Sequence, residues 1–253
     1  MGFADFRARM LSGERLVGTF VKIPAYEMIE YLADTGLDFI CLDGEHSPFD
    51  RARMDACLAM ARAFDFPTLV RIPSGSPENV LQALDSGAVG VVCPHIDTPE
   101  KARALAKAAR FGDGGRGFAG STRWAGLTRR GMPEILEQSE TETVVIGQIE
   151  EPAGVDAVDE IAATPGLDGL FIGPADLTVA YGETALWSEK LMDAYARVGA
   201  ACAKAGKANM TFVPSHAQAE LVAAHGVTMF FVSSEMGWMA DGARAAARAF
   251  KPE

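Results

Sequence analysis

The feature that most restricts the fold is an eightfold alternation of short apolar runs with longer amphipathic segments. The apolar runs have the length and composition of buried strands, and the amphipathic segments have helical spacing. The expected strands cover residues 16–23, 38–42, 68–72, 89–93, 143–149, 168–172, 207–213 and 228–233. The expected helices cover residues 3–11, 26–35, 51–64, 77–86, 99–109, 152–163, 191–205, 216–224 and 236–250.

Strands that alternate with helices form βαβ units, and such units build parallel sheets. Eight of them within 253 residues predict an α/β protein with a single domain over residues 1–253, folded as a (β/α)8 or TIM barrel. A doubly wound open sheet is the alternative. It is less favoured because no Gly-x-Gly-x-x-Gly motif opens a helix after the first strand.

The composition argues against several kinds of partner. The formal charge is −11 at pH 7, and no large cluster of Lys and Arg interrupts it, so we expect neither nucleic acid nor a membrane surface as partner. No run approaches the ~18 apolar residues of a membrane span, and the N-terminus lacks a signal-peptide pattern. Four cysteines without CxxC spacing predict no disulfide framework and indicate a reducing cytoplasm.

Polar residues stand at the carboxyl ends of the expected strands. In (β/α)8 barrels this rim carries the active site. The segment FICLDGEHSPFD, residues 39–50, leaves the second strand with two carboxylates and an imidazole, those of Asp43, Glu45 and His46. Later strands add further polar side chains to the same rim, namely Arg71, Gln148, Glu150 and Asp176.

Two of these carboxylates suit a hard metal ion. Glu150 and Asp176 follow neighbouring strands, and two carboxylates completed by water are typical ligands of Mg²⁺ or Mn²⁺. A pair of solvated loop carboxylates is the alternative. Arg71 lies in an otherwise apolar strand, where its guanidinium either stabilises a developing negative charge or forms a buried ion pair that holds the rim.

His46 is the candidate general base, because an ordinary imidazole titrates near neutral pH. Asp43 and Glu45 flank it, and Asp85, at the end of a helix, is a candidate orienting carboxylate. A Schiff-base aldolase would instead need a lysine at the mouth of the barrel. Lys22, near the end of the first strand, is the only candidate for that role.

One long irregular stretch, residues 111–131, is rich in glycine and arginine. Loops of this length in compact domains are usually functional or disordered. Its basic residues in an acidic chain indicate that it covers an anionic ligand or packs on a neighbouring subunit, with a solvated loop as the alternative. We hypothesise that it closes over the second substrate.

Five segments, in chain order, resemble the HpcH/HpaI family of class II aldolases, within the phosphoenolpyruvate/pyruvate barrel superfamily: LDGEHSPFD, TLVRIP, LDSGAVGVVCPHIDT, GQIEEPAGV and LDGLFIGPADLT. The resemblance implies an aldolase dependent on a divalent metal ion such as Mg²⁺, Mn²⁺ or Co²⁺. Such an enzyme converts pyruvate or hydroxypyruvate into an enolate and adds it to an aldehyde, forming a 4-hydroxy-2-oxo acid, or runs the cleavage. It also implies a hexamer whose last helix, here residues 236–250, is exchanged between barrels.

The resemblance also implies roles for individual residues. Glu150 and Asp176 resemble the metal ligands, His46 and Asp85 the acid/base dyad, and Arg71 the group that stabilises the enolate. Whether His46 or a water on the metal ion moves the proton stays open.

Other residues resemble the surroundings of these groups. Asp43 and Glu45 would hold the catalytic groups in position without contacting the substrate. The remaining residues resemble the lining of the 2-oxo acid site, with the last a weaker addition from the long loop: Gln148, Gly173, Pro174, Ala175 and Ser121.

Two departures from the family pattern concern the barrel mouth. His95 stands where an apolar residue is usual, and Ser233-Ser234-Glu235 stands where Gly-x-Asp is expected. Two alternatives to an aldolase remain. One is a carbon–carbon ligase or synthase that joins the same enolate to a CoA thioester. The other is a metabolite-binding barrel without catalysis.

Overall fold

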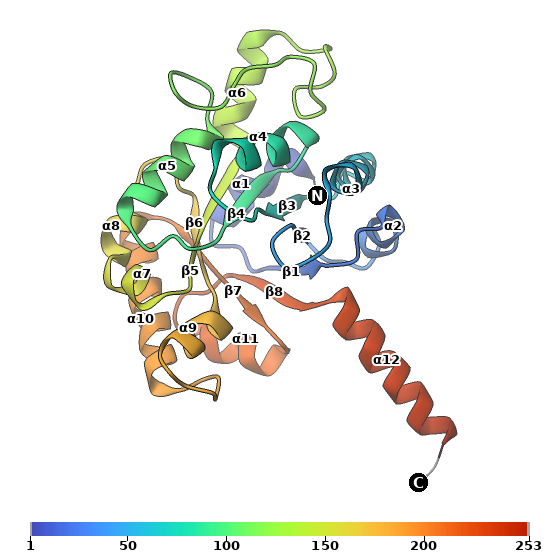
Figure 1. Ribbon diagram of the computed structural model, residues 1–253, viewed down its shortest axis with the longest axis vertical. Coiled ribbons are helices and arrows are strands. Elements are labelled where there is room, and N and C mark those ends of the chain that lie inside the picture. The colour runs from blue at the N-terminus through green and yellow to red at the C-terminus, as the bar shows by residue number, and fades with distance from the viewer. Residues whose placement is uncertain (1, 252–253) are drawn as a thin grey trace.

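The structure, a computed structural model, describes residues 2–251. Its strands form one closed parallel barrel in chain order, surrounded by helices (Figure 1). This confirms the predicted (β/α)8 barrel, and the observed strand ends lie within two residues of the expected ones. The strands are β1 Leu16–Val21, β2 Phe39–Asp43, β3 Thr68–Arg71, β4 Gly90–Cys93, β5 Val144–Ile149, β6 Gly169–Ile172, β7 Ala208–Val213 and β8 Met229–Ser234.

Helices connect successive strands and run antiparallel to them, so their C-terminal ends lie at the N-terminal face of the barrel. The connecting helices are α2 Tyr26–Ala33, α3 Arg51–Ala63, α4 Pro77–Ser86, α5 Pro99–Ala109, α6 Met132–Glu142, α7 Pro152–Asp156, α8 Val158–Ala162, α9 Pro174–Ala180, α10 Glu189–Ala205 and α11 His216–Ala223. Two further helices precede and follow the barrel, α1 Phe3–Leu11 and α12 Glu235–Phe250.

Two differences from the sequence prediction concern the helices on either side of β5. The helix expected over residues 152–163 is interrupted at Ala157, whose φ of −94° and ψ of 9° lie outside the helical region, so α7 and α8 are separate. Helix α6 was not expected, because its sequence MPEILEQSETE has no clear apolar stripe. Its start does carry a local signal, since Glu134 accepts the Gly131 N–H at 2.9 Å.

Phenylalanines from four strands fill the barrel interior. Phe231 lies with its ring centre 5.1 Å from Phe20, 4.8 Å from Phe39 and 4.9 Å from Phe171. Gly18 on β1 leaves room for this cluster, because a Cβ there would lie 2.5 Å from the Phe39 carbonyl oxygen and 2.6 Å from its ring. The cluster forms a rigid apolar floor beneath the barrel mouth.

The N-terminal face of the barrel is closed by α1. Its buried Phe6 lies 5.8 Å, ring centre to ring centre, from Phe39. Arg7 pairs at 2.6 Å with the buried carboxylate of Asp168, which also accepts the Val145 N–H at 2.8 Å. Because this end is sealed, a small molecule reaches the barrel interior from the opposite rim.

Replacing the central ring of the cluster tests its contribution to stability. We expect Phe231→Ala to lower the free energy of unfolding by about 3–5 kcal/mol, because the lost ring leaves a cavity among three others. The same substitution at Phe64, which is 51% exposed, serves as the control and should change it by no more than about 0.5 kcal/mol. Urea unfolding followed by circular dichroism measures both. An equal decrease in the free energy of unfolding for the two variants would contradict the proposed contribution of the phenylalanine cluster to stability.

Candidate active site

A fully buried carboxylate, that of Asp43 at the end of β2, is the centre of the polar network at the mouth. Its Oδ1 accepts from Arg71 Nε at 3.0 Å, and its Oδ2 accepts from Arg71 Nη2 at 2.8 Å and from Lys22 Nζ at 2.6 Å. The His46 backbone N–H also donates to Oδ1, at 3.1 Å. Burial alone raises the pKa of Asp43, but these pairs outweigh it and lower the pKa to about 2.

Arg71, the last residue of β3, is held on several sides. Its guanidinium lies 4.5 Å above the Phe20 ring, and its Nε lies 3.3 Å from Glu45 Oε2. Burial alone lowers the pKa of Arg71, but Asp43 and Glu45 raise it, so the side chain stays charged. Within residues 2–251, Nη1 bonds no protein group and is not buried, so this nitrogen is free to bind a ligand.

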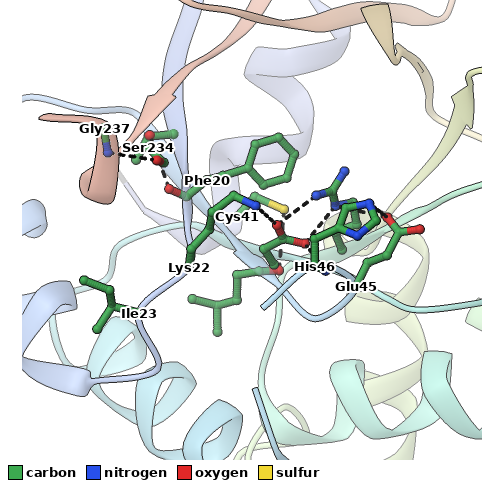
Figure 2. A network of polar contacts seen from close by, with 12 residues as sticks. Phe20, Lys22, Ile23, Cys41, Glu45, His46, Ser234 and Gly237 are labelled. Atoms are coloured by element: carbon green, nitrogen blue, oxygen red, sulfur yellow. Dashed lines mark hydrogen bonds and ion pairs between the residues drawn. The ribbon is translucent and has the colours of Figure 1, made fainter. Parts of the chain in front are cut away.

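His46 lies beside this pair, in the loop between β2 and α3. Its backbone is fixed by Asp43, whereas its imidazole is 60% exposed, with Nε2 3.7 Å from Glu45 Oε2. Figure 2 shows His46 and Glu45 side by side at the edge of the network. The arrangement leaves an accessible imidazole next to a charged guanidinium, which suits proton transfer at a carbon whose negative charge the guanidinium stabilises.

A second buried carboxylate, that of Glu150, lies directly after β5. Its Oε1 accepts the His95 N–H at 2.7 Å, and its Oε2 accepts from Gln148 Nε2. Burial raises the pKa of Glu150, and the negative charge of Asp176 after β6 raises it further. A buried carboxylate whose pKa is raised by a second carboxylate nearby favours a bound cation.

Gly173 allows the two strand ends to lie close together. A Cβ at this position would lie 2.9 Å from Glu150 Cβ and 3.4 Å from Gln148 Nε2. The following turn starts α9, where Pro174 is buried and Ala175 is exposed. These residues, predicted to line the 2-oxo acid site, are therefore brought together with the predicted metal ligands.

The donor atoms present fit a hard divalent cation. Among residues 2–251, no group of three or more His, Cys, Asp or Glu side chains surrounds one point. Glu150 and Asp176 supply two carboxylates, and the buried Gln148 Oε1 has no hydrogen-bond partner within the same residues. An unpartnered amide oxygen beside two carboxylates forms an all-oxygen donor set, which Mg²⁺ and Mn²⁺ prefer.

Asp85 is not brought to His46 within one chain. It lies at the C-terminal end of α4, and therefore at the face opposite the mouth. Its Oδ1 accepts from Arg116 Nε at 3.1 Å and from Arg116 Nη2 at 2.5 Å. Within one barrel, His46 and Asp85 therefore do not form the predicted dyad. The direction of α4 places the two residues at opposite faces of the barrel.

The loop over residues 111–131 also lies at the N-terminal face. It connects α5 to α6, and its Arg123 pairs at 2.5 Å with Asp55 on α3 and donates at 2.7 Å to the Ser86 carbonyl. Ser121, predicted to line the site, is exposed in this loop. The hypothesis that the loop closes over the second substrate is wrong for its own barrel, because the loop starts at the C-terminal end of α5 and Arg123 binds the C-terminal end of α4, and both helices end at the rim where the strands begin.

Two residues at the mouth have roles that the sequence did not indicate. Lys22 was considered only as a Schiff-base lysine, yet its ammonium forms an ion pair with Asp43, whereas that chemistry needs a neutral amine. Glu235 is buried at the start of α12, where its Oε1 accepts the N–H groups of Lys22 at 2.7 Å and Ile23 at 2.6 Å. The sequence hint for the role of Glu235 was the segment Ser233-Ser234-Glu235, which stands where Gly-x-Asp is expected.

His95 is the third such residue, and its backbone is strained. It has φ of +57°, which is uncommon for residues other than glycine. Its Nδ1 lies 3.1 Å from Glu150 Oε1 and 2.9 Å from Glu151 Oε1. The burial of His95 lowers its pKa, but the two carboxylates outweigh that and raise it. The sequence did contain a hint of this role, because His95 stands where the family usually has an apolar residue.

Comparison with known proteins agrees with this site. The family model of the HpcH/HpaI aldolase/citrate lyase family matches residues 16–241. The chain is 34% identical to a hydroxypyruvate/pyruvate aldolase of Roseovarius nubinhibens, over 79% of this chain and 80% of that protein. It is 30% identical to a 5-keto-4-deoxy-D-glucarate aldolase of Klebsiella pneumoniae, over 97% of this chain and 96% of that protein.

A solved structure supports the same conclusion. An HpcH/HpaI aldolase/citrate lyase family protein from Burkholderia cenocepacia superposes with a TM-score of 0.91 at 33% identity, covering 98% of this chain and 99% of that one. The fold and site define an enolate-forming barrel enzyme. The chain belongs to the HpcH/HpaI aldolase/citrate lyase family and is a class II aldolase, a carbon–carbon lyase. The aldolase names of both relatives favour this class over the thioester-dependent alternative.

The lowered pKa of Asp43 predicts a specific acid dependence of stability. The folded pKa of about 2 lies below the ordinary 3.8, so the stabilisation is complete above about pH 4 and is lost as the pH falls towards 2. We expect Asp43→Asn to be about 3 kcal/mol less stable than wild type at pH 6. At pH 2 the difference in the free energy of unfolding between wild type and Asp43→Asn should be smaller by about 2 kcal/mol.

Urea unfolding at several pH values measures this difference. The exposed Asp34, replaced by Asn, is the control, and its small effect should not change with pH. A gap between wild type and Asp43→Asn that stays constant down to pH 2 would contradict the lowered pKa.

Proposed function

We propose that this aldolase forms and cleaves 4-hydroxy-2-oxo acids, using pyruvate or hydroxypyruvate as the donor and an aldehyde as the acceptor. The observation that carries the proposal is the placement of two groups around one mouth. The Glu150 and Asp176 carboxylates follow β5 and β6, and they face Arg71 and His46, which end and follow β3 and β2. The relatives named as hydroxypyruvate/pyruvate aldolase support the donor.

A divalent metal ion fits the donor side of this site. The family generally depends on such an ion. In our proposal Glu150 and Asp176 hold it, and Mg²⁺, Mn²⁺ and Co²⁺ are the candidates. When bound, the ion supplies Lewis-acid stabilisation to the oxygens of the 2-oxo acid.

The chain's own groups bind and orient the donor. The Gln148 side chain and the backbone from Gly173 to Ala175 line the space next to Glu150. Arg71 presents its free Nη1 to the oxygen that gains negative charge when the enolate forms. Asp43 holds this guanidinium in place beforehand, so no reorganisation is needed during the reaction.

His46 moves the proton in the proposed mechanism. It takes a proton from the carbon next to the ketone, and the electrons of that C–H bond form the enolate. The enolate carbon then forms a bond to the aldehyde carbon, while the carbonyl electron pair becomes an alkoxide that accepts the proton from His46. Cleavage follows the same steps in reverse.

The last helix supports an assembly of several copies. Beyond Glu235, none of the described residues of α12 is buried, and the helix projects away from the barrel (Figure 1). It exposes Trp238, Met239 and Phe250. An apolar surface of this kind marks an interaction site. We propose that a second copy covers it through helix exchange within the expected hexamer.

The same assembly offers a place for the remaining predicted residues. Asp85 and Arg123 line an open surface hollow of about 550 Å³ between the C-terminal end of α4 and the first turns of α3. In our proposal a neighbouring copy brings its own mouth to this hollow. Asp85 would then orient the imidazole of a second chain's His46, and Ser121 would reach that site from the same loop.

The proposed location is the cytoplasm. All four cysteines are unpaired and buried, as a reducing compartment favours. None of the helices within residues 2–251 has the length and apolar character needed to cross a membrane. The proposed partners are small molecules and further copies of the chain.

Proton exchange on pyruvate in deuterated water tests the proposed function. We expect methyl deuteration with Mg²⁺ or Mn²⁺ and none after treatment with a chelator. Glu150→Gln should abolish the exchange and weaken Mn²⁺ binding by roughly 100-fold or more, because it removes a carboxylate ligand. Proton NMR follows the exchange, and calorimetry measures the binding of Mn²⁺ alone.

The neighbouring carboxylate gives a matched control. Glu151→Gln should change Mn²⁺ binding by less than about fivefold, because Glu151 contacts His95 and is not one of the two proposed ligands. Full exchange by Glu150→Gln, or none by wild type with either metal, would contradict the proposal.

The assembly is tested by the mass of the purified protein. We expect wild type to be a hexamer by size exclusion with light scattering. The double variant Trp238→Asp and Met239→Asp should dissociate, because it places charge on the apolar face of α12. Asp241→Asn, on the same helix but in a polar position, is the control and should keep the wild-type mass. A monomeric wild type would refute the exchange of α12.

A further inference from the structure

The glycine- and arginine-rich loop over residues 111–131 contains one arginine that is fully buried. The Arg116 side chain has no exposed surface, although it lies in a loop at the face opposite the mouth. Burying a guanidinium is costly unless its charge is paired. Within residues 2–251 its one ion-pair partner is Asp85, the carboxylate that the sequence predicts as the partner of His46. Arg116 is therefore a candidate for a role in that dyad.

The glycines of this loop form the turn that positions Arg116. The Arg116 N–H donates to the Arg110 carbonyl oxygen at 2.7 Å, which closes the turn. Glycine alone fits just before Arg116, because a Cβ on Gly115 would lie 2.3 Å from the same oxygen. Gly112, with φ of +137°, supplies a backbone conformation that other residues rarely adopt. The sequence FGDGGRG therefore determines where the arginine side chain begins.

Two aromatic rings fix the direction of the guanidinium. Its central carbon lies 4.7 Å from the centre of the Phe111 ring and 4.8 Å from that of Trp124. Trp124 is buried in a small apolar cluster with Ala125 and Ile135, separate from the main core. The faces of such rings attract a cation, which offsets part of its lost hydration. The rings therefore restrict the orientation in which the guanidinium meets its carboxylate partner.

Arg116 binds only one oxygen of Asp85. Its Nε and Nη2 both donate to Oδ1, at 3.1 and 2.5 Å. An ordinary fork-shaped pair uses both carboxylate oxygens, as Arg71 does on Asp43. In the described part of the chain, Asp85 Oδ2 accepts no hydrogen bond and is not buried, and the Asp85 side chain is 21% exposed beside the surface hollow. This second oxygen is therefore available to a donor from another chain.

The imidazole of His46 has the complementary need. Within residues 2–251 its ring nitrogens form no hydrogen bond, and the carboxylate nearest to Nε2, that of Glu45, is 3.7 Å away. A catalytic imidazole works best when a carboxylate accepts one ring N–H and thereby fixes the tautomer and the orientation of the ring. One barrel thus presents an imidazole without a hydrogen bond, and elsewhere a carboxylate that is fixed through one oxygen and open at the other.

We propose that Arg116 is a positioning residue, which holds the Asp85 carboxylate so that Oδ2 accepts the ring N–H of His46 in a neighbouring copy. The inference rests on the proposed function and on the assembly within it. It adds a residue that acts on proton transfer through Asp85 and never touches the substrate. The charge of Arg116 keeps the carboxylate ionised, and its contact with Oδ1 alone leaves Oδ2 free for the imidazole.

Hybrid assemblies test this directly, because each proposed site takes His46 from one chain and Arg116 from another. His46→Ala and Arg116→Met chains with different affinity tags are coexpressed, and assemblies that carry both tags are purified. About one site in four then combines an intact His46 with an intact Arg116, so pyruvate proton exchange should recover to roughly a quarter of the wild-type rate. Each variant alone should be slower than the hybrid by about fivefold or more.

Kinetics of the single and double variants separate positioning from general support of the loop. Arg116→Met should lower kcat for proton exchange by roughly 10- to 100-fold and change KM by less than about threefold, because pyruvate binding does not involve it. In an Asp85→Asn background the same substitution should have no further effect, since Arg116 acts only through that carboxylate. Light scattering checks that every variant keeps the wild-type mass.

A second variant and a control complete the design. Arg116→Lys keeps the charge but not the fork of donors, so kcat should fall only about three- to tenfold. It replaces Arg116→Met in all measurements if the latter does not assemble. Arg129, in the same loop, is exposed and donates to the Gly126 carbonyl oxygen at 2.9 Å. Arg129→Met should leave the exchange rate and the mass unchanged.

Hybrids of His46→Ala with Asp85→Asn distinguish the possible failures. Absence of exchange in wild type overturns the proposed function and the inference with it. Exchange in wild type without recovery in these hybrids overturns the dyad between copies, and again the inference. Recovery here, but none in the hybrids of His46→Ala with Arg116→Met, overturns the inference alone. Losses of kcat that add up in the double variant would do the same, because Arg116 would then act independently of Asp85.

Discussion

The buried Asp43 carboxylate is the interaction on which the site depends. It binds Nε and Nη2 of Arg71, the Lys22 ammonium and the His46 backbone N–H. Arg71 ends β3, whereas Lys22 follows β1 and His46 lies in the loop after β2. Removing a carboxylate at this point would leave two cations without their partner in a desolvated place, which is costly. The same pairing keeps Arg71 charged and oriented before any substrate arrives, as electrostatic stabilisation of an enolate requires.

The barrel gives this network its geometry. A floor of phenylalanines supports Arg71 from below, since Phe20 lies under the guanidinium and Phe231 packs against Phe20. Closure of the sheet in chain order puts the Glu150 side of the mouth opposite β1 and β2.

One barrel does not contain all the predicted groups. Asp85 and the loop over residues 111–131 lie at the face opposite the mouth, and α12 leaves its own barrel with an apolar surface exposed. Both observations support the proposed assembly, in which neighbouring copies would complete the site and cover the helix. Glu235 connects α12 to the barrel mouth, because it is the first residue of α12 and its carboxylate accepts the backbone N–H of Lys22.

The sequence by itself determined the barrel, because apolar runs alternating with helical segments leave few other folds. It also predicted most groups at the mouth, since residues that follow parallel strands share one rim; Glu150, Asp176, Arg71 and His46 are examples. Only the tertiary structure decided which charges pair. The separation of Asp85 from His46 and the sharing of Asp43 by Arg71 and Lys22 depend on helix direction and distances across the barrel. Local sequence patterns do not encode these, because the contacts join residues far apart in the chain.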